Sequence, residues 1–208
     1  MWQNKLLSSP ENKLKSVDIK EISHSATDIF SHYVRLSLGK FIEKYGQNNP
    51  SKIKFTAEEL NLKCGAILQS LKHKNDTRYT DVLNQFGDKR FCKFKIEKNK
   101  LTENYGLYFF EFQSELKYIG STKQSFLKRI NNGYGNISPR NCFKGGQSTN
   151  CKINSNLNQI LEKGGQTDIK FYVFPMTDKA KIISTEKKLI SKATSELNYD
   201  LWNKQHNV

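Results

Sequence analysis

The hydrophobic and polar positions of the N-terminal half follow a helical rather than a strand period. Apolar residues recur at intervals of three and four from position 25 to position 45, and Gly46 then supplies a stop signal. This pattern predicts one amphipathic helix over residues 25–45. Residues 1–16 are polar and hold few apolar anchors, so we expect an extended arm ahead of that helix.

A pair of short helices joined by a tight turn follows. Thr56 and Glu59 form a capping box, because side chains at this spacing can each bond the other residue's backbone N–H. The next apolar stripe begins after Gly65 and ends in the basic run at residues 72–75. Residues 92–96 then alternate between apolar and charged, as a half-buried strand does. The order resembles a winged helix-turn-helix, and a plain small helical domain accounts for it equally well.

The pattern changes beyond a polar stretch at residues 98–104. Residues 106–112 and 116–120 are rich in aromatic and apolar side chains and are separated by a short turn, which predicts a β-hairpin. A capping box at Ser121–Gln124 predicts a helix directly after it. The remaining elements are a helix, a strand and a last amphipathic helix at residues 153–161, 171–174 and 182–193.

These elements predict an α+β protein of two domains. We expect residues 1–100 to form the arm and a mainly helical, winged-helix-like DNA-recognition domain. Residues 101–208 are expected to form a small antiparallel three-stranded sheet flanked by helices.

Charge is the compositional feature that changes this picture. The 208 residues include 34 Lys or Arg and 20 Asp or Glu, which gives a net charge of +14. The excess is spread along the chain, since residues 1–100 hold 19 basic and 11 acidic side chains and residues 101–208 hold 15 and 9. Such a balance favours a polyanionic partner, although a very soluble protein without one would show it too.

Other features narrow the class of protein. Aromatic residues make up 12 % of the chain, which argues against wholesale disorder. No apolar run is long enough to span a membrane or to serve as a signal peptide. The four cysteines form no C-x-x-C pair and are too few for a disulfide scaffold, so we expect neither a structural zinc site nor disulfides. A reducing, bacterial cytoplasmic location is the expectation.

Two triplets on the predicted hairpin carry the clearest signal of function. Gly106-Leu107-Tyr108 lies on its first strand and Tyr118-Ile119-Gly120 on its second. Over residues 104–205, the chain resembles the GIY-YIG nuclease family, departing from the first triplet only at Leu107. An Arg after the hairpin, a Glu in a later helix and an Asn near the end complete the family order, at Arg129, Glu186 and either Asn198 or Asn203.

Glu186 can also be weighed on physical grounds. It lies within the apolar stripe of its helix, with Ile182 four residues before it and Leu189 three residues after it. An unpaired carboxylate is costly there, so it needs a cation, and a hard divalent ion such as Mg²⁺ is one solution. A Lys or Arg partner, or rotation to the edge of the stripe, would meet the same need.

The other three residues have structural as well as catalytic interpretations. Arg129 follows Phe126 by three residues, so its guanidinium could hold a phosphate from the inner edge of the helix or simply be solvated. Tyr108 and Tyr118 lie on paired strands, where their hydroxyls could meet in one place or their rings could pack across strands.

The resemblance implies roles for these residues in the in-line attack of water on a phosphodiester. Tyr108 would help to deprotonate the water and Tyr118 would orient the nucleophile or the phosphate. Arg129 would stabilise charge on the phosphoryl group, and Glu186 would hold one divalent metal, Mg²⁺ or Mn²⁺. For the Asn, the distance from the Glu suits Asn198, whereas the Trp-Asn ending suits Asn203.

The long polar loop at residues 131–151 resembles that of small type II restriction endonucleases in this family. The resemblance implies cleavage of double-stranded DNA by two copies, as a homodimer on the DNA. The Asn and Gln side chains of this loop could read base edges, because each can form two hydrogen bonds with adenine. The expected DNA-binding residues are Lys72, Lys74, Lys117, Lys123, Arg140, Asn141, Gln147, Asn150 and Lys152.

Two alternatives to a restriction enzyme stay open. One is another GIY-YIG nuclease: a nicking or homing enzyme, a single-strand-specific nuclease or a phage-defence effector. The other is a non-catalytic DNA-binding protein that keeps a decayed nuclease fold.

Overall fold

The computed structural model describes residues 2–7, 14–45, 54–164 and 168–203. The chain divides into two compact units. The first, here called the sheet unit, comprises Met1–Ile22, Phe94–Gly135 and Ile160–Val208. The second, the helical unit, comprises Ser23–Lys93 and Asn136–Gln159.

The boundaries of these two units differ from the predicted division of the chain at residue 100. The N-terminal segment belongs with the C-terminal half, because β1 (Lys15–Val17) pairs with β6 (Ile169–Pro175). Residues 1–16 are therefore not simply an extended arm, since α1 (Trp2–Leu6) buries Trp2 and Leu6. Part of the predicted polar loop instead belongs to the helical unit, where Cys142 and Phe143 join its core.

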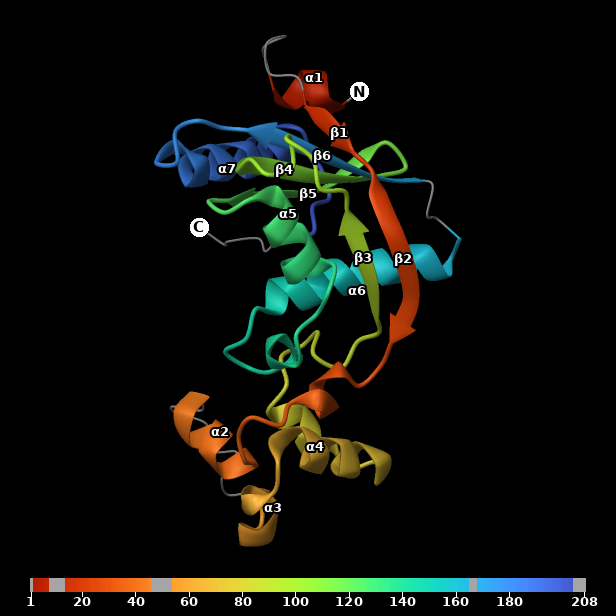
Figure 1. Cartoon of the computed structure of the whole chain (residues 1–208), viewed down its shortest axis with the longest axis vertical. Helices are drawn as coiled ribbons and strands as arrows, with labels where there is room; N and C mark the ends of the chain where they lie inside the picture. The colour runs from red at the N-terminus through yellow and green to blue at the C-terminus, as the bar shows by residue number, and fades with distance from the viewer. Residues whose placement is uncertain (1, 8–13, 46–53, 165–167, 204–208) are drawn as a thin grey trace. The chain divides into compact units, whose positions relative to one another are not determined.

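The sheet unit contains a four-stranded antiparallel sheet (Figure 1). The strand order is β1-β6-β4-β5, with β4 (Gly106–Phe112) and β5 (Glu115–Thr122) forming the predicted hairpin. Four strands replace the expected three, because Val17 of β1 is buried opposite Phe171 at the edge of β6. The hairpin and the strand at 171–174 are confirmed.

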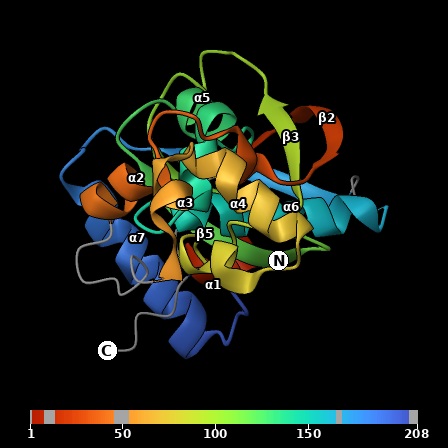
Figure 2. The ribbon, with the colours of Figure 1, turned by 90° about the horizontal axis from the view of Figure 1, so that it is seen from below.

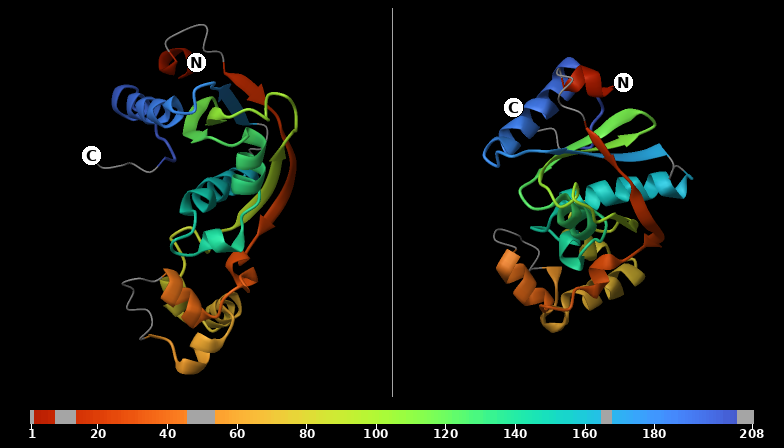
Figure 3. Two further views of the ribbon diagram at one scale, coloured as in Figure 1. Left: turned by 60° about the vertical axis from the view of Figure 1, so that its left-hand side comes forward. Right: turned by 45° about the horizontal axis from the view of Figure 1, so that its top comes forward.

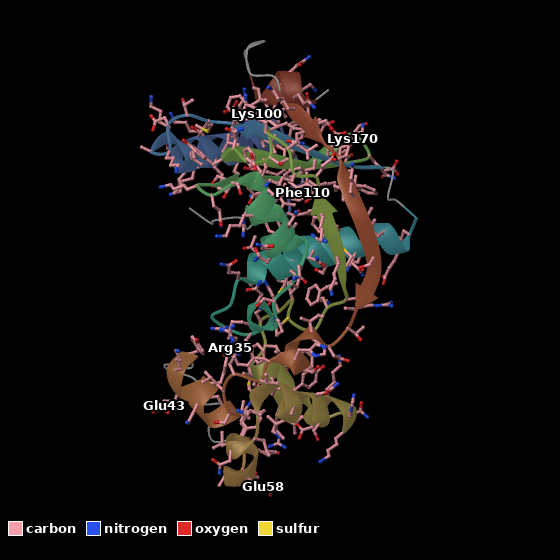
Figure 4. The ribbon with its side chains drawn as sticks, viewed as in Figure 1. Arg35, Glu43, Glu58, Lys100, Phe110 and Lys170 are labelled. Carbon is pink, nitrogen blue, oxygen red and sulfur yellow. The ribbon has the colours of Figure 1, made fainter. Side chains whose placement is uncertain are left out.

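Both faces of this sheet are covered, which is why β4 is buried along nearly its whole length. On one face, Leu107, Phe109 and Ile119 join a core with Trp2 of α1 and Ile182 of α7 (Lys181–Ser191). Figure 3 shows α7 running beside the strands of this sheet. On the other face, Phe110, labelled in Figure 4, packs its ring against Tyr118, Tyr134 and Phe171.

The helix after the hairpin begins later than predicted. Because β5 continues to Thr122, Ser121 is a strand residue and the capping box at Ser121–Gln124 is wrong. Ser125 is the N-cap of α5 (Phe126–Arg129) and its hydroxyl accepts a hydrogen bond from the Lys128 amide. A π-helical turn, η4 (Ile130–Tyr134), follows directly.

The helical unit holds α2 (Leu38–Tyr45), α3 (Ala57–Asn61) and α4 (Cys64–His73), which Figure 2 shows from below. The Thr56–Glu59 capping box is confirmed in both directions, at 2.8 and 3.2 Å. The core of the helical unit includes large apolar side chains from distant parts of the sequence: Phe30, Leu38, Leu68, Phe91 and Phe143.

One further expectation for this region was wrong, and a second is not confirmed. The single helix over residues 25–45 is replaced by the end of β2 (Ile19–Ala26), a short 3₁₀ helix η1 (Ile29–His32) and α2. Asp28 interrupts it, because its φ of 54° is incompatible with a continuing right-handed helix. The strand at 92–96 exists as β3 (Phe91–Ile96), but it pairs with β2 as a two-stranded sheet, so the winged-helix arrangement is not confirmed. Gly46 lies outside the described residues.

The segment at 153–161 lies within a longer helix, α6 (Ser148–Glu162), and the last predicted helix is α7 with the π turn η7 (Lys192–Glu196). Within the described ranges, no helix has the length and apolarity needed to cross a membrane. All four cysteines are buried and free.

Trp2 fixes α1 to the sheet through a buried polar contact. Its indole Nε1–H donates to Glu111 Oε2 at 2.6 Å, and Lys170 Nζ lies 3.4 Å from Glu111 Oε1. We expect Trp2→Phe to lower the free energy of unfolding by about 1–3 kcal/mol, because the buried carboxylate loses a donor. Urea denaturation measures this change, with Lys5→Ala, an exposed position on the same helix, as the control. Equal stability of Trp2→Phe and wild type would contradict the anchoring role.

Candidate active site

The hairpin register brings Tyr108 and Tyr118 together on one face of the sheet. Tyr108 lies opposite Gly120, and Phe110 lies opposite Tyr118, so the two tyrosines are diagonal neighbours across the strands. Their ring centroids are 6.2 Å apart. Both side chains are buried.

Gly120 makes this arrangement possible because it has no side chain. A Cβ atom at this position would lie 2.4 to 2.5 Å from Cζ, Cε2 and the hydroxyl oxygen of Tyr108. The phenol therefore occupies the space above the backbone of the opposite strand. The glycine of the second triplet is explained by the tyrosine of the first.

A third tyrosine, Tyr134, completes the group. Its hydroxyl lies 2.8 Å from that of Tyr108 and 3.1 Å from that of Tyr118. The π turn η4 positions it, and the Gly135 amide donates to the Ile130 carbonyl at 2.7 Å in the i→i+5 pattern of such a turn. Sequence reasoning missed Tyr134, because its five-residue distance from Arg129 does not fit the α-helical spacing.

Arg129 joins two of the three phenols. Its Nε donates to the Tyr108 hydroxyl at 3.2 Å and its Nη2 to the Tyr134 hydroxyl at 2.7 Å. The guanidinium carbon also lies 4.3 Å from the centroid of the Tyr134 ring. Within the described ranges, Arg129 is thus neither simply solvated nor paired with a carboxylate, and its positive charge faces neutral phenols.

Burial determines the protonation of this cluster. It raises the pKa of Tyr108, Tyr118 and Tyr134 well above the usual value, while the positive charge of Arg129 opposes the shift at each of them. The three phenols are therefore protonated at neutral pH in the free protein. A phenolate at Tyr108 or Tyr134 would be stabilised chiefly by Arg129, and one at Tyr118 by the hydrogen bond from Tyr134 and then by Arg129.

Glu186 approaches the sheet from α7. Its Oε2 accepts a hydrogen bond from the Ser121 hydroxyl of β5 at 2.6 Å, and the side chain is half-buried. Burial raises the pKa of this carboxyl, whereas the Ser121 hydroxyl, the charge of Arg129 and the Ser121 amide act in the opposite direction. Among the described residues, the hydrogen-bond partner of Glu186 is a serine, and the alternative of a Lys or Arg partner is not seen there.

The two candidate asparagines have different environments. The Asn203 side chain bonds both backbone groups of Ile119, accepting from its N–H at 3.1 Å and donating to its carbonyl at 2.7 Å. It thereby extends the pairing along the exposed edge of β5, next to Tyr118. Asn198 is exposed, has a φ of 53°, and borders a hollow of about 340 Å³ beside Trp2. Asn203 therefore bonds the neighbour of Tyr118, whereas Asn198 lies near the start of the same strand, where Glu115 and Leu116 line the same hollow.

Two of the expected DNA-binding residues, Lys117 and Lys123, belong to the sheet unit. Lys123 is exposed and follows the end of β5. Lys117 is only 16 % exposed, and its ammonium pairs with Glu115 at 2.8 Å and Asp200 at 3.8 Å.

The expected DNA-binding residues of the helical unit differ in how far they are exposed to solvent. Lys74 and Gln147 are exposed, whereas the ammonium of Lys72 is bonded to Asp28 and Asp88. Arg140 stacks on the Tyr45 ring with its guanidinium carbon 4.0 Å from the centroid. Asn141 and Lys152 are half-buried, and Asn150 is 1 % exposed.

The described residues contain no group of three or more His, Cys, Asp or Glu side chains that could hold a metal ion. Glu186 is accordingly a single carboxylate. Mg²⁺ is commonly bound through one or two carboxylates together with substrate phosphates and water. The donor set fits that mode of binding, and it does not fit a cage made only of protein ligands.

Comparisons with protein-family models, curated proteins and solved structures found no match to this chain.

The fit of Tyr108 over Gly120 can be tested by substitution. We expect Gly120→Ala to lower the free energy of unfolding by about 1–3 kcal/mol, because the new methyl group overlaps the phenol. In a Tyr108→Ala background, the same substitution should have little effect. Chemical denaturation of the four proteins gives the coupling energy between the two positions. Additive effects would contradict the contact.

The ionised carboxylate of Glu186 should lower the free energy of unfolding at neutral pH. Because burial raises its pKa in the folded protein, the ionised carboxylate is disfavoured by folding above that pKa. We expect Glu186→Gln, which can still accept the Ser121 hydrogen bond, to unfold at higher urea concentration than wild type at pH 7. The difference should shrink as the pH falls to 4 and the wild-type carboxyl protonates. Lower stability of the variant at pH 7 would contradict the shift.

Proposed function

We propose that this protein is a divalent-metal-dependent endonuclease that hydrolyses phosphodiester bonds of double-stranded DNA at specific sequences, as a type II restriction enzyme does. One observation carries the proposal. Arg129 is bonded to Tyr108 within a cluster of phenols, and its charge also acts on the carboxylate of Glu186. These residue types and their order are those of the GIY-YIG nuclease family, which the sequence resembles.

The cluster provides what hydrolysis of a phosphodiester requires, namely a positive charge for the phosphoryl oxygens and hydroxyls to orient water. Arg129 presents its N–H groups to the phosphate, which competes with the phenols for the same donors. Tyr108, protonated in the free protein, hydrogen-bonds the attacking water, and it can take up the proton of that water only after its own proton has passed to solvent, which leaves a phenolate that the adjacent guanidinium stabilises. Tyr118 orients the water or the phosphate, and Tyr134 holds the other two hydroxyls in place.

Glu186 is the residue that would hold the metal. Its carboxylate is half-buried beside β5 and is positioned by the Ser121 hydroxyl. A bound Mg²⁺ or Mn²⁺ would supply positive charge for the leaving oxygen. Asn203 supports the same strand by fixing the backbone of Ile119.

The charge distribution fits DNA as the substrate. The helical unit contains 15 basic and 7 acidic residues and the sheet unit 19 and 13, so each unit is positively charged. Neutralisation of phosphates by such surfaces releases counterions and makes binding fall steeply with salt. The described part of each chain contains one such cluster, so two copies would act together to cut both strands.

Plasmid cleavage tests the proposal. We expect wild type with Mg²⁺ to convert several plasmids into discrete fragments, and Glu186→Gln to lose on the order of 10²- to 10³-fold of that rate. Glu196→Gln, at an exposed carboxylate, is the matched control and should cleave normally. Unfolding curves confirm that the variants are folded.

Other outcomes would revise the proposal. Nicking, or digestion confined to single strands, would indicate a different nuclease of the same family. Sequence-specific binding without cleavage in any divalent metal would contradict the enzyme and support a non-catalytic DNA-binding protein. Undiminished cleavage by Glu186→Gln would exclude Glu186 as the metal ligand.

A further inference from the structure

A buried amide holds an exposed glutamine at the start of α6. The Asn150 Nδ2 donates to Gln147 Oε1 at 2.7 Å, although Asn150 is 1 % exposed and Gln147 is exposed. The Asn150 Oδ1 is buried without a hydrogen-bond partner among the described atoms. An unpaired buried carbonyl costs stability, so folding alone does not account for an asparagine here. Its one side-chain bond orients Gln147.

The loop before α6 is closely packed and supports this pair. A Cβ atom at Gly146 would lie 2.4 Å from the Arg140 carbonyl oxygen and 2.9 Å from that of Phe143. The Gly146 amide donates to the Phe143 carbonyl at 2.9 Å, and Arg140 Nη1 donates to the Lys144 carbonyl at 3.2 Å. Gln147 is thus presented from a backbone with little freedom, as a residue that reads a ligand should be.

The surrounding charge fits a polyanion. The segment of the helical unit that contains Gln147, Asn136–Gln159, holds three Lys or Arg and no Asp or Glu. The first turn of α6 also lacks acidic residues, so the positive end of its dipole is not neutralised by a carboxylate of its own. Within this segment, Arg140 and Lys144 stand closest in sequence to Gln147 on its N-terminal side.

The hydrogen bond from Asn150 also defines what Gln147 can recognise. It occupies one lone pair of Oε1 and directs the amide, which leaves the second lone pair and both Nε2 hydrogens for a partner. In the major groove, adenine presents the N6 amino donor beside the N7 acceptor, which matches this arrangement in two hydrogen bonds.

We propose that Gln147 is a specificity-determining residue that reads an adenine in the major groove of duplex DNA, and that Asn150 is its positioning residue. This inference rests on the proposed function, because it takes duplex DNA as the ligand. It also changes the part expected of Asn150, which contacts Gln147 and not the DNA.

Selection from a randomised duplex library, with the full-length protein in metal-free buffer, tests this. Wild type should enrich a sequence with adenine at a defined position. Gln147→Ala should lose on the order of 10-fold of the preference at that position alone, with affinity for non-specific duplex within about 2-fold of wild type. Gln159→Ala, an exposed glutamine of the same helix, should select the wild-type sequence.

Two further variants separate reading from folding. Gln147→Glu keeps the length of an exposed side chain but can only accept, so it should replace the adenine preference by one for cytosine. Asn150→Asp removes the donor to Oε1 and should weaken the adenine preference while the exposed Gln147 is retained. Thermal unfolding identifies any variant that is not folded.

Distinct results would overturn the inference. An adenine preference unchanged in both Gln147 variants would overturn it and leave the proposed nuclease standing. Equal selection by Asn150→Asp and wild type would remove the positioning role. Absence of any duplex binding by wild type would overturn both this inference and the proposed substrate.

Discussion

A buried guanidinium must have acceptors for its N–H groups, and this requirement organises the sheet unit around Arg129. The acceptors are phenol oxygens, which come from the hairpin at Tyr108 and from the π turn at Tyr134. Tyr108 can reach that position only because Gly120 leaves space opposite it. The hydrogen bonds of Arg129 to the two phenols thus depend on the register of β4 on β5, on Gly120 and on the π turn.

The same burial that orders the cluster also limits its chemistry. The phenols are protonated in the free protein, and Arg129 is engaged with them. A phosphate bound in this place would replace neutral acceptors by a charged one, which strengthens the hydrogen bonds of the guanidinium. Glu186 is held beside β5 at the expense of desolvation, as carboxylates retained for function often are. Burial of the Glu186 carboxylate therefore lowers the stability of the folded protein at neutral pH, while it holds a negative charge beside β5.

Much of the fold followed from periodicity, and the exceptions have physical causes. The hairpin and α7 were predicted because their apolar patterns are long and regular, whereas β1 offers three residues of which only Val17 is buried. Asp28 interrupts a stripe that otherwise has the period of one helix, because its backbone has a φ of 54° and its carboxylate bonds Lys72, 44 residues further along the chain. Tyr108, Tyr118, Arg129 and Glu186 could be chosen from motif order. Tyr134 and the burial of Asn150 depend on a π turn and on tertiary packing, which no spacing rule encodes.

The proposed nuclease requires that the tyrosine–arginine cluster with Glu186 binds a scissile phosphate and one divalent cation. A crystal structure of the protein with duplex DNA, prepared with Mn²⁺ under conditions of slow cleavage, tests it most directly through anomalous scattering. We expect one Mn²⁺ site at the Glu186 carboxylate, with a DNA phosphate within hydrogen-bonding distance of Arg129. Ordered DNA bound elsewhere, with no metal at Glu186 and Arg129 still bonded to both tyrosines, would contradict it.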